Sequence, residues 1–201
     1  MAMADAWPVH PWPGPLPRWG DAVLVIAVAN GDVDVDVDVD DYGKGAARTQ
    51  ARARIRAAVR EALSLSLAIA IDRITLQSDP GSAPRLSIEE WPSAPGVSIS
   101  HAGAISMAAI NPMGAVGLDV MQVRAISDWA RVAHDYLGMA AAVRLAALPE
   151  LERARAFAQA WAEREACLKL HGEMLAEWTP LPDCRVRALA LPAGLAGALA
   201  L

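Results

Sequence analysis

Residues 161–169 read WAEREACLK and lie in the middle of a long helical pattern. Trp161, Glu165 and Lys169 recur every four residues, so on a helix they fall within one arc of roughly 80°. An aromatic ring, a carboxylate and an ammonium group therefore share one face, with Arg164 beside the carboxylate as a second cation. Taken alone, this is also the pattern of an ordinary solvated ion pair, because a Glu four residues before a Lys stabilises any helix by about 0.2–0.5 kcal/mol.

The composition indicates a folded domain with an acidic surface. A chain of 201 residues can bury one sizeable core or form two small halves packed together. Its net charge of −5 and isoelectric point of about 5.3 disfavour a nucleic-acid-binding protein that relies on a global basic field. An anionic ligand must then be met by a local cluster of Arg and Lys.

The cysteines and the first residues predict a cytoplasmic protein with reduced thiols. Cys167 and Cys184 form no C-x-x-C motif, and residues 1–21 contain Pro and Trp where a signal peptide needs a basic start and an apolar core. The most apolar internal run, residues 62–71, is far shorter than the ~20 residues that span a bilayer. We therefore expect no membrane segment.

The first part of the chain combines an irregular arm with a strand and a long helix. Residues 1–20 are rich in Pro and Trp and predict an extended arm, whereas residues 22–29 form an apolar run typical of a buried strand. Residues 32–41 alternate Asp and Val, which fits either a strand or a low-complexity loop. A metal site in this run is disfavoured, because a row of carboxylates on one face does not converge on one ion. Residues 46–70 predict an amphipathic helix.

Five further strands are expected, over residues 73–77, 86–90, 97–101, 105–110 and 115–120. The last two are joined by the turn Asn111-Pro-Met-Gly114, which predicts a hairpin. Helices are then expected over residues 127–137, 139–148 and 149–171, with Ser127 as an N-cap and Gly172 as a stop, followed by an edge strand over 185–191. This order predicts an α+β fold of two similar halves, at about 20–110 and 111–201, within one domain.

Three short segments carry the residues suited to chemistry: Ser98-Ile-Ser-His101, Gly117-Leu-Asp-Val120 and the helix around Glu165. Asp119 is the lone acid of an apolar strand, which is costly unless a cation is its partner or local N–H groups bind it. A Ser100–His101 dyad is disfavoured because adjacent strand residues point to opposite faces. His101 can instead bind an anion or lie hydrogen-bonded at the edge of the core.

Two other groups of side chains admit competing interpretations. Arginines recur every four residues along the predicted helix, at Arg48, Arg52, Arg56 and Arg60. They form either a solvated face paired with the acidic run or a phosphate-binding edge, with Lys44 and Arg48 nearest the helix N-terminus. A zinc site made by the two cysteines and His171 is disfavoured, because no suitable fourth ligand other than Asp183 lies near Cys184.

The ordered set of these segments resembles the 4′-phosphopantetheinyl transferases, specifically the monomeric type whose two similar α+β halves form a pseudodimer. The resemblance runs over roughly residues 44–172. It is carried by Lys44, Arg48-Thr49, Pro84-Arg85, Ser98-Ile-Ser-His101-Ala-Gly, Gly117-Leu-Asp119-Val and Trp161-Ala-Glu-Arg-Glu165-Ala-Cys-Leu-Lys169.

The resemblance implies a metal-dependent transfer reaction. In the family, a serine of an apo acyl or peptidyl carrier protein attacks the β-phosphate of coenzyme A, receives the phosphopantetheine arm and releases 3′,5′-ADP. The matching Mg²⁺ ligands are Asp119 and Glu165, and a hard cation suits carboxylate and phosphate oxygens. Glu165, or a metal-bound water beside it, is the expected base, and Lys169 the expected cation on the phosphates.

The same resemblance implies which residues bind the nucleotide phosphates of coenzyme A, including the 3′-phosphate. By their match to the family pattern they are Lys44, Arg48, Arg85, Ser100 and His101. We expect a monomeric cytoplasmic enzyme that docks its acidic carrier through a local basic or apolar patch around Arg124, Arg131 and Met139.

The sequence departs from the family pattern at two positions. Met121 stands where many relatives have a second acid, with Gln122 next, which leaves the third metal ligand open. Arg164 replaces the usual Lys before the glutamate and keeps its charge with another geometry. Met121 motivates an alternative function, a non-catalytic module that binds coenzyme A or a carrier protein. A structural protein without a ligand is a third, less favoured hypothesis.

Overall fold

The computed structural model describes residues 6–20, 22–31, 41–78 and 82–201, without the side chains of residues 41–44. It has a mixed α+β fold, divided into two compact units that we describe one at a time: Pro8–Val116, and Met1–Trp7 together with Gly117–Leu201. The alternating Asp and Val residues of the predicted run lie outside the described part of the chain, except for Asp41 at the start of a helix.

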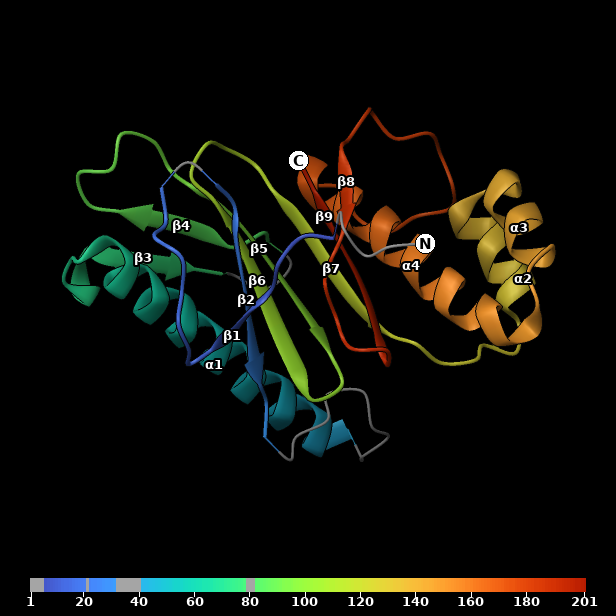
Figure 1. Ribbon diagram of the computed structural model, residues 1–201, viewed down its shortest axis with the longest axis horizontal. Helices are drawn as coiled ribbons and strands as arrows, with labels where there is room; N and C mark the ends of the chain where they lie inside the picture. Colours follow the sequence, from blue (N-terminus) through green and yellow to red (C-terminus); the bar gives the residue numbers. More distant parts are fainter. Residues whose placement is uncertain (1–5, 21, 32–40, 79–81) are drawn as a thin grey trace. The chain divides into compact units, whose positions relative to one another are not determined.

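The unit Pro8–Val116 is built on a four-stranded sheet with the order β1-β2-β6-β5 (Figure 1). The strands are β1 (His10–Trp12), β2 (Leu24–Ala29), β5 (Gly96–Ala102) and β6 (Ile105–Asn111). β2 pairs antiparallel with β6, and β6 with β5, whereas β1 from the Pro/Trp-rich arm pairs parallel with β2. The arm is thus more regular than expected, since its backbone extends the sheet.

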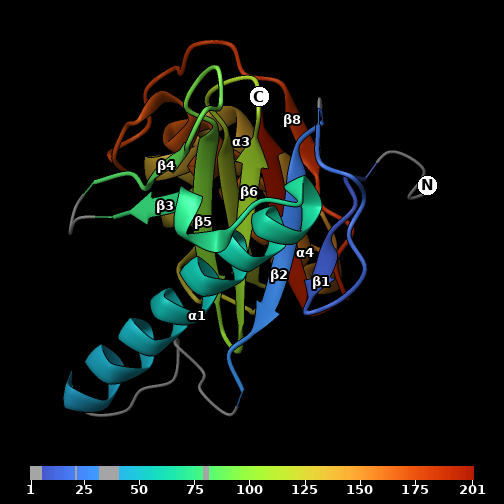
Figure 2. The ribbon, with the colours of Figure 1, turned by 90° about the vertical axis from the view of Figure 1, so that its left-hand side faces the viewer.

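Helix α1 (Asp41–Leu67) lies across one face of this sheet, as Figure 2 shows. Ile55, Val59 and Leu63 are fully buried in the core of the unit, which confirms the predicted apolar face of the helix. The arginine row on α1 is used in part for structure, because Arg60 donates hydrogen bonds from Nε to the carbonyl of Ile74 at 2.9 Å and from Nη2 to that of Ile71 at 3.1 Å.

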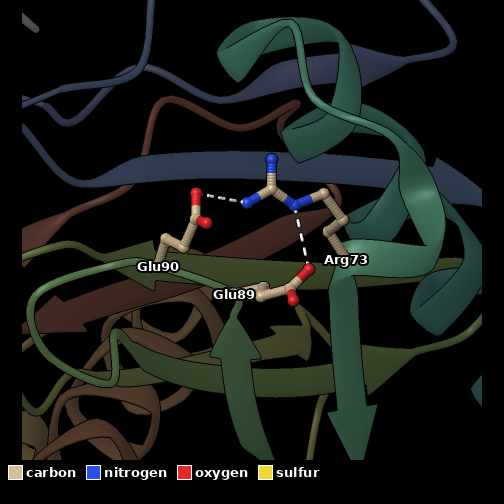
Figure 3. Close-up of polar contacts among 3 residues, drawn as sticks. All are labelled: Arg73, Glu89 and Glu90. Atoms are coloured by element: carbon tan, nitrogen blue, oxygen red, sulfur yellow. Dashed lines mark hydrogen bonds and ion pairs between the residues drawn. The ribbon is translucent and has the colours of Figure 1, made fainter.

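Strands β3 (Ile74–Gln77) and β4 (Arg85–Ile88) form a separate antiparallel hairpin beside α1. Arg73 ties the two ends of this hairpin together: it donates from Nε to Glu89 at 3.0 Å and from Nη2 to Glu90 at 2.6 Å (Figure 3). Both acids are exposed, so this fork contributes little to stability. The two predicted strands are confirmed within one or two residues.

The second unit packs α4 (Glu150–His171) on a three-stranded antiparallel sheet with the order β7-β9-β8. Its strands are β7 (Gly117–Gln122), β8 (Val186–Ala188) and β9 (Leu195–Ala200). Helix α4 lies along β7 and β9 (Figure 1). It ends at Gly172, whose φ of 69° is readily adopted only by glycine and which confirms the predicted stop.

The region between β7 and α4 is less regular than predicted. It contains α2 (Trp129–Val132), a π-helical turn η2 (Ala133–Leu137) and α3 (Met139–Ala146), all near the first half of α4. The predicted N-cap at Ser127 is wrong, because the helix begins after Asp128 and that residue makes no side-chain cap hydrogen bond. Buried Ala133, Leu137 and Leu145 join Phe157 of α4 in one cluster.

Two further predictions are wrong. The predicted hairpin of 105–110 and 115–120 does not form, because β6 pairs with β2 and β5 whereas β7 pairs with β9 in the other sheet. The cysteines are not reduced thiols: Cys167 of α4 and Cys184 form a disulfide with their Cα atoms 6.2 Å apart. Their separation of 17 residues has no motif that would reveal the pairing, and bonded sulfurs cannot serve as zinc ligands.

Among the described residues, no helix is both long and apolar enough to cross a membrane.

Candidate functional site

A glycine allows β7 to lie directly on the backbone of α4. A Cβ atom at Gly117 would overlap the carbonyl oxygen of Ala166 and lie 2.8 Å from the backbone nitrogen of Leu170. No other residue fits there without moving the helix or the strand, because the obstructing atoms belong to the backbone. The strand therefore carries Asp119 past the part of the helix that holds Glu165 and Lys169.

Lys169 reaches from α4 to β7 and pairs with Asp119. Its Nζ donates a hydrogen bond to Asp119 Oδ1 at 2.7 Å and another to the carbonyl oxygen of Leu118 at 3.1 Å. Asp119 is 7% exposed, so the ammonium group supplies the cation that a carboxylate in an apolar strand needs. Lys169 thus pairs across to the strand, rather than only along its own helix as in an ordinary i,i+4 pair.

Glu165 lies half-buried one turn before Lys169 on the same face of α4. Burial raises the pKa of Glu165 above its usual value, and the negative charge of Asp119 raises it further, whereas Lys169 and Arg164 act in the opposite direction. The two carboxylates are therefore close enough to repel each other. Arg164 is held by a hydrogen bond from Nη1 to the carbonyl of Thr179 at 2.8 Å.

Aromatic side chains support the helix one turn before Glu165. The ring of Trp161 stacks on Phe157 with centroids 5.9 Å apart and meets Tyr136 in a tilted contact at 5.8 Å. Phe157 is buried in the cluster formed with α3 and η2. This packing fixes the orientation of α4, and with it the direction of the Glu165 side chain.

The carboxylates of Asp119 and Glu165 suit a divalent cation, although they are only two ligands. Among the residues that the structure describes, no group of three or more His, Cys, Asp or Glu side chains could hold a metal. Mg²⁺ is commonly held by one or two carboxylates together with waters and substrate phosphates, so Asp119 and Glu165 fit this ion. A divalent cation would also relieve their mutual repulsion. Met121 and Gln122, both half-buried, follow on β7.

The residues expected to bind nucleotide phosphates lie in the unit Pro8–Val116. Arg48 on α1 and Arg85 at the start of β4 are exposed, and the side chain of Lys44 falls outside the described part of the structure. On β5, Ser100 is buried and His101 is half-buried. The structure therefore brings together Asp119, Glu165 and Lys169 within one unit, and the residues expected to bind phosphates belong to the unit Pro8–Val116.

Two polar residues beside His101 were not singled out from the sequence. Ser106 of β6 and Asn30, just after β2, are fully buried and hydrogen-bonded to each other. His101 Nδ1 lies 2.7 Å from Ser106 Oγ. Ser106 falls in a predicted apolar strand and Asn30 directly follows another, so nothing in the sequence pattern marks them as partners.

The predicted docking residues all lie in the unit with α4. Arg124 lines a cavity of about 400 Å³, together with Ile126, Trp129, Arg153 and Phe157 among others. The guanidinium of Arg153 lies 4.6 Å above the ring of Trp129, which closes one side of this cavity with a cation–π contact. Met139 is 62% exposed on α3.

Comparison with known proteins gives one family match, in the C-terminal region. The sequence model of the 4′-phosphopantetheinyl transferase superfamily matches residues 115–196, a range that includes β7, α4, β8 and the first two residues of β9. The family resemblance predicted from the sequence is thereby confirmed over these residues. No curated protein matches the chain.

Proposed function

We propose that this chain, which carries the 4′-phosphopantetheinyl transferase superfamily region at residues 115–196, moves the phosphopantetheine arm of coenzyme A to a serine of an apo carrier protein. The observation that carries the proposal is the arrangement of Asp119, Glu165 and Lys169 on β7 and α4. Two neighbouring carboxylates and an ammonium group are the groups that the transfer requires. The fold proposal is that the two units correspond to the two halves of the family's pseudodimer.

In this proposal, Asp119 and Glu165 hold Mg²⁺, which when bound would neutralise charge on the pyrophosphate of coenzyme A. The carrier hydroxyl forms a new O–P bond at the β-phosphate while the phosphoanhydride bond breaks and 3′,5′-ADP leaves. Glu165, or a water beside it, takes the hydroxyl proton. The raised pKa of Glu165 favours this role, since a base works best when its pKa is closer to the working pH.

Lys169 can hold the strand and contact a phosphate at the same time. An ammonium group has three N–H donors, and two of them are used, on Asp119 and on the carbonyl of Leu118. The third is proposed to donate to a phosphate oxygen of coenzyme A. Lys44, Arg48, Arg85, Ser100 and His101 remain proposed phosphate ligands on the strength of the family resemblance alone.

The proposed partner is an acidic acyl or peptidyl carrier protein, bound by a monomer through a patch that includes Arg124, Arg131 and Met139. Arg124 and the apolar wall of its cavity support this choice, because an acidic partner with an exposed apolar side chain could use both. The cytoplasm stays the proposed compartment, although the disulfide is an argument against it, since reducing conditions disfavour such bonds.

The direct test is to incubate the protein with coenzyme A, Mg²⁺ and several apo carrier proteins, and to follow the mass of each carrier. A mass gain equal to the phosphopantetheine arm supports the proposal. Glu165→Gln should lower the rate by about 10²–10⁴-fold, whereas Glu163→Gln, an exposed position on the same helix, should not. Absence of transfer to every carrier, together with absence of coenzyme A binding, would rule the enzyme out.

A second candidate function is a module that binds coenzyme A or a carrier protein without catalysis. Met121 favours it, because a thioether replaces the second acid that many relatives have. Under this hypothesis, coenzyme A binds in the absence of transfer, and Glu165→Gln leaves its dissociation constant unchanged. Under the transferase hypothesis, transfer requires Mg²⁺ and is lost in this variant.

A further inference from the structure

A buried chain of hydrogen bonds ends at His101. Ser106 Oγ donates to Asn30 Oδ1 at 2.8 Å, and His101 Nδ1 lies 2.7 Å from the same Ser106 oxygen. Ser106 is fully buried and Asn30 is 1% exposed, whereas His101 is half-buried. Of these three side chains, His101 alone reaches the surface.

The backbone holds this chain in register from several sides. Antiparallel pairing places His101 directly opposite Ser106, and Ser106 opposite Val28 on β2. Asn30, two residues after Val28, donates from its backbone N–H to the carbonyl of Ala104 at 2.7 Å. Its own carbonyl accepts a hydrogen bond from Nη1 of Arg54 on α1. The sheet therefore fixes the backbone positions from which the side chains of His101, Ser106 and Asn30 extend.

The hydrogen-bond directions determine where the proton of the imidazole lies. A serine hydroxyl has one hydrogen, and Ser106 gives it to Asn30 Oδ1. Ser106 can then only accept from His101, so Nδ1 of the ring must carry a hydrogen. Most free imidazole rings carry it on Nε2 instead, so the contact selects one tautomer, as an orienting partner does for a catalytic or metal-binding histidine.

Burying these two side chains has a cost that apolar residues would avoid. Asn30 Nδ2 is buried and has no hydrogen-bond partner among the described residues. Polar groups left in this state destabilise a fold, whereas apolar side chains of similar size would pack without penalty. Ser106 and Asn30 instead set the orientation and the protonation of the half-buried His101 ring.

We propose that Ser106 and Asn30 are positioning residues, which hold the His101 ring in one orientation with Nδ1 protonated. This inference rests on the proposed function, in which His101 binds the nucleotide phosphates of coenzyme A. Ser106 and Asn30 touch no substrate and act through the ring.

The test measures the ring and the ligand separately. Protein labelled with ¹⁵N-histidine is examined at alkaline pH, where the imidazole is neutral, and His101 is assigned by its loss in His101→Gln. Wild type should show a protonated Nδ1. Asn30→Ala removes the acceptor, frees the Ser106 hydrogen for His101 Nδ1 and should move the ring proton to Nε2. Ser106→Ala should also move the ring proton to Nε2, and in this variant residue 106 can form no hydrogen bond with Nδ1.

Coenzyme A affinity is then measured by calorimetry without metal. Ser106→Ala should weaken binding about tenfold, whereas Ser64→Ala, the same change at a part-buried serine of α1 outside the proposed binding residues, should not. Far-UV circular dichroism and a urea titration check that each variant is folded, and Asn30→Ala serves if Ser106→Ala does not fold.

The two readouts distinguish this inference from the proposed function. Unchanged ¹⁵N shifts of His101 in both variants, or an Nε2-protonated ring in wild type, would overturn the positioning role. A protonated Nδ1 in wild type and the predicted changes in the variants, with no coenzyme A binding by any form either without metal or with Mg²⁺, would instead preserve the positioning role and refute the proposed function.

Discussion

Reducing the disulfide between Cys167 and Cys184 should destabilise the unit that contains α4. The bond ties the middle of α4 to a segment that is mostly exposed between Gly172 and β8. Closing a loop of 17 residues removes about 10 cal/mol/K of entropy from the unfolded chain, which is about 3 kcal/mol at 25 °C. The expected loss of unfolding free energy on reduction is therefore about 3 kcal/mol.

Urea titration with and without a dithiol reductant measures this loss, with circular dichroism and tryptophan fluorescence as two probes. At a denaturant slope of about 2 kcal/mol/M, the midpoint should fall by about 1.5 M. The matched control is Cys184→Ser, at a half-buried position: it should resemble reduced wild type and be insensitive to reductant. Both probes must agree, because the chain has two compact units that can unfold separately.

Two results would refute this reasoning. The first is an unchanged midpoint after complete reduction, which would mean that the bond does not restrict the unfolded chain. The second is alkylation of both cysteines in native protein that has never met a reductant, which would mean that the bond is not formed.

The remaining predictions concern the site on β7 and α4. Gly117→Ala should lower the unfolding free energy by about 1–3 kcal/mol in urea titration, because its Cβ would overlap the Ala166 carbonyl. Lys169→Met should cost about 1–3 kcal/mol by the same measurement, since it leaves Asp119 buried without its cation, although the 30% exposure of Lys169 reduces the loss. Burial raises the pKa of Glu165, so the folded protein keeps a proton there at pH values where the unfolded chain has lost it. The unfolding free energy should therefore fall as pH rises from the ordinary glutamate pKa to the raised one. Urea titrations across that pH range should show this fall in wild type and not in Glu165→Gln.

Regular periodicity made the helices and most strands predictable. The apolar face of α1, with Ile55 and Val59, appears in the sequence every three to four residues, and its burial follows directly. The stop at Gly172 was equally clear, because a residue with a positive φ is favoured where a helix ends. Signals of this kind are local, so a single sequence contains them.

Strand β9 escaped prediction although it is the central strand of its sheet. Its sequence, LAGALA, has the composition of a helix or a loop, and no alternation marks it as a strand. Tertiary context overrides this propensity, because β7 and β8 on either side supply its hydrogen-bond partners. Ala198 and Ala200 are fully buried against Ala162 and Ala166 of α4, so small residues here allow close packing of the helix on the sheet.

The sequence named the residues of the candidate site, which stay a prediction, and did not reveal the contacts between them. Family motifs named Asp119, Glu165 and Lys169, but the ion pair between the first and last joins residues 50 positions apart. The same limit applies to Ser106 and Asn30, whose contact spans 76 positions. Interactions between distant positions depend on strand register, which a periodic pattern does not specify.

The absence of a side chain at Gly117 has a consequence for how this site can diverge over evolutionary time. Since backbone touches backbone there, no exchange of one side chain for another can widen or narrow the spacing of β7 and α4 in small steps. Gradual variation of the proposed cation site must therefore arise at neighbouring positions whose side chains can change in small steps, and Met121 on the same strand is one of them.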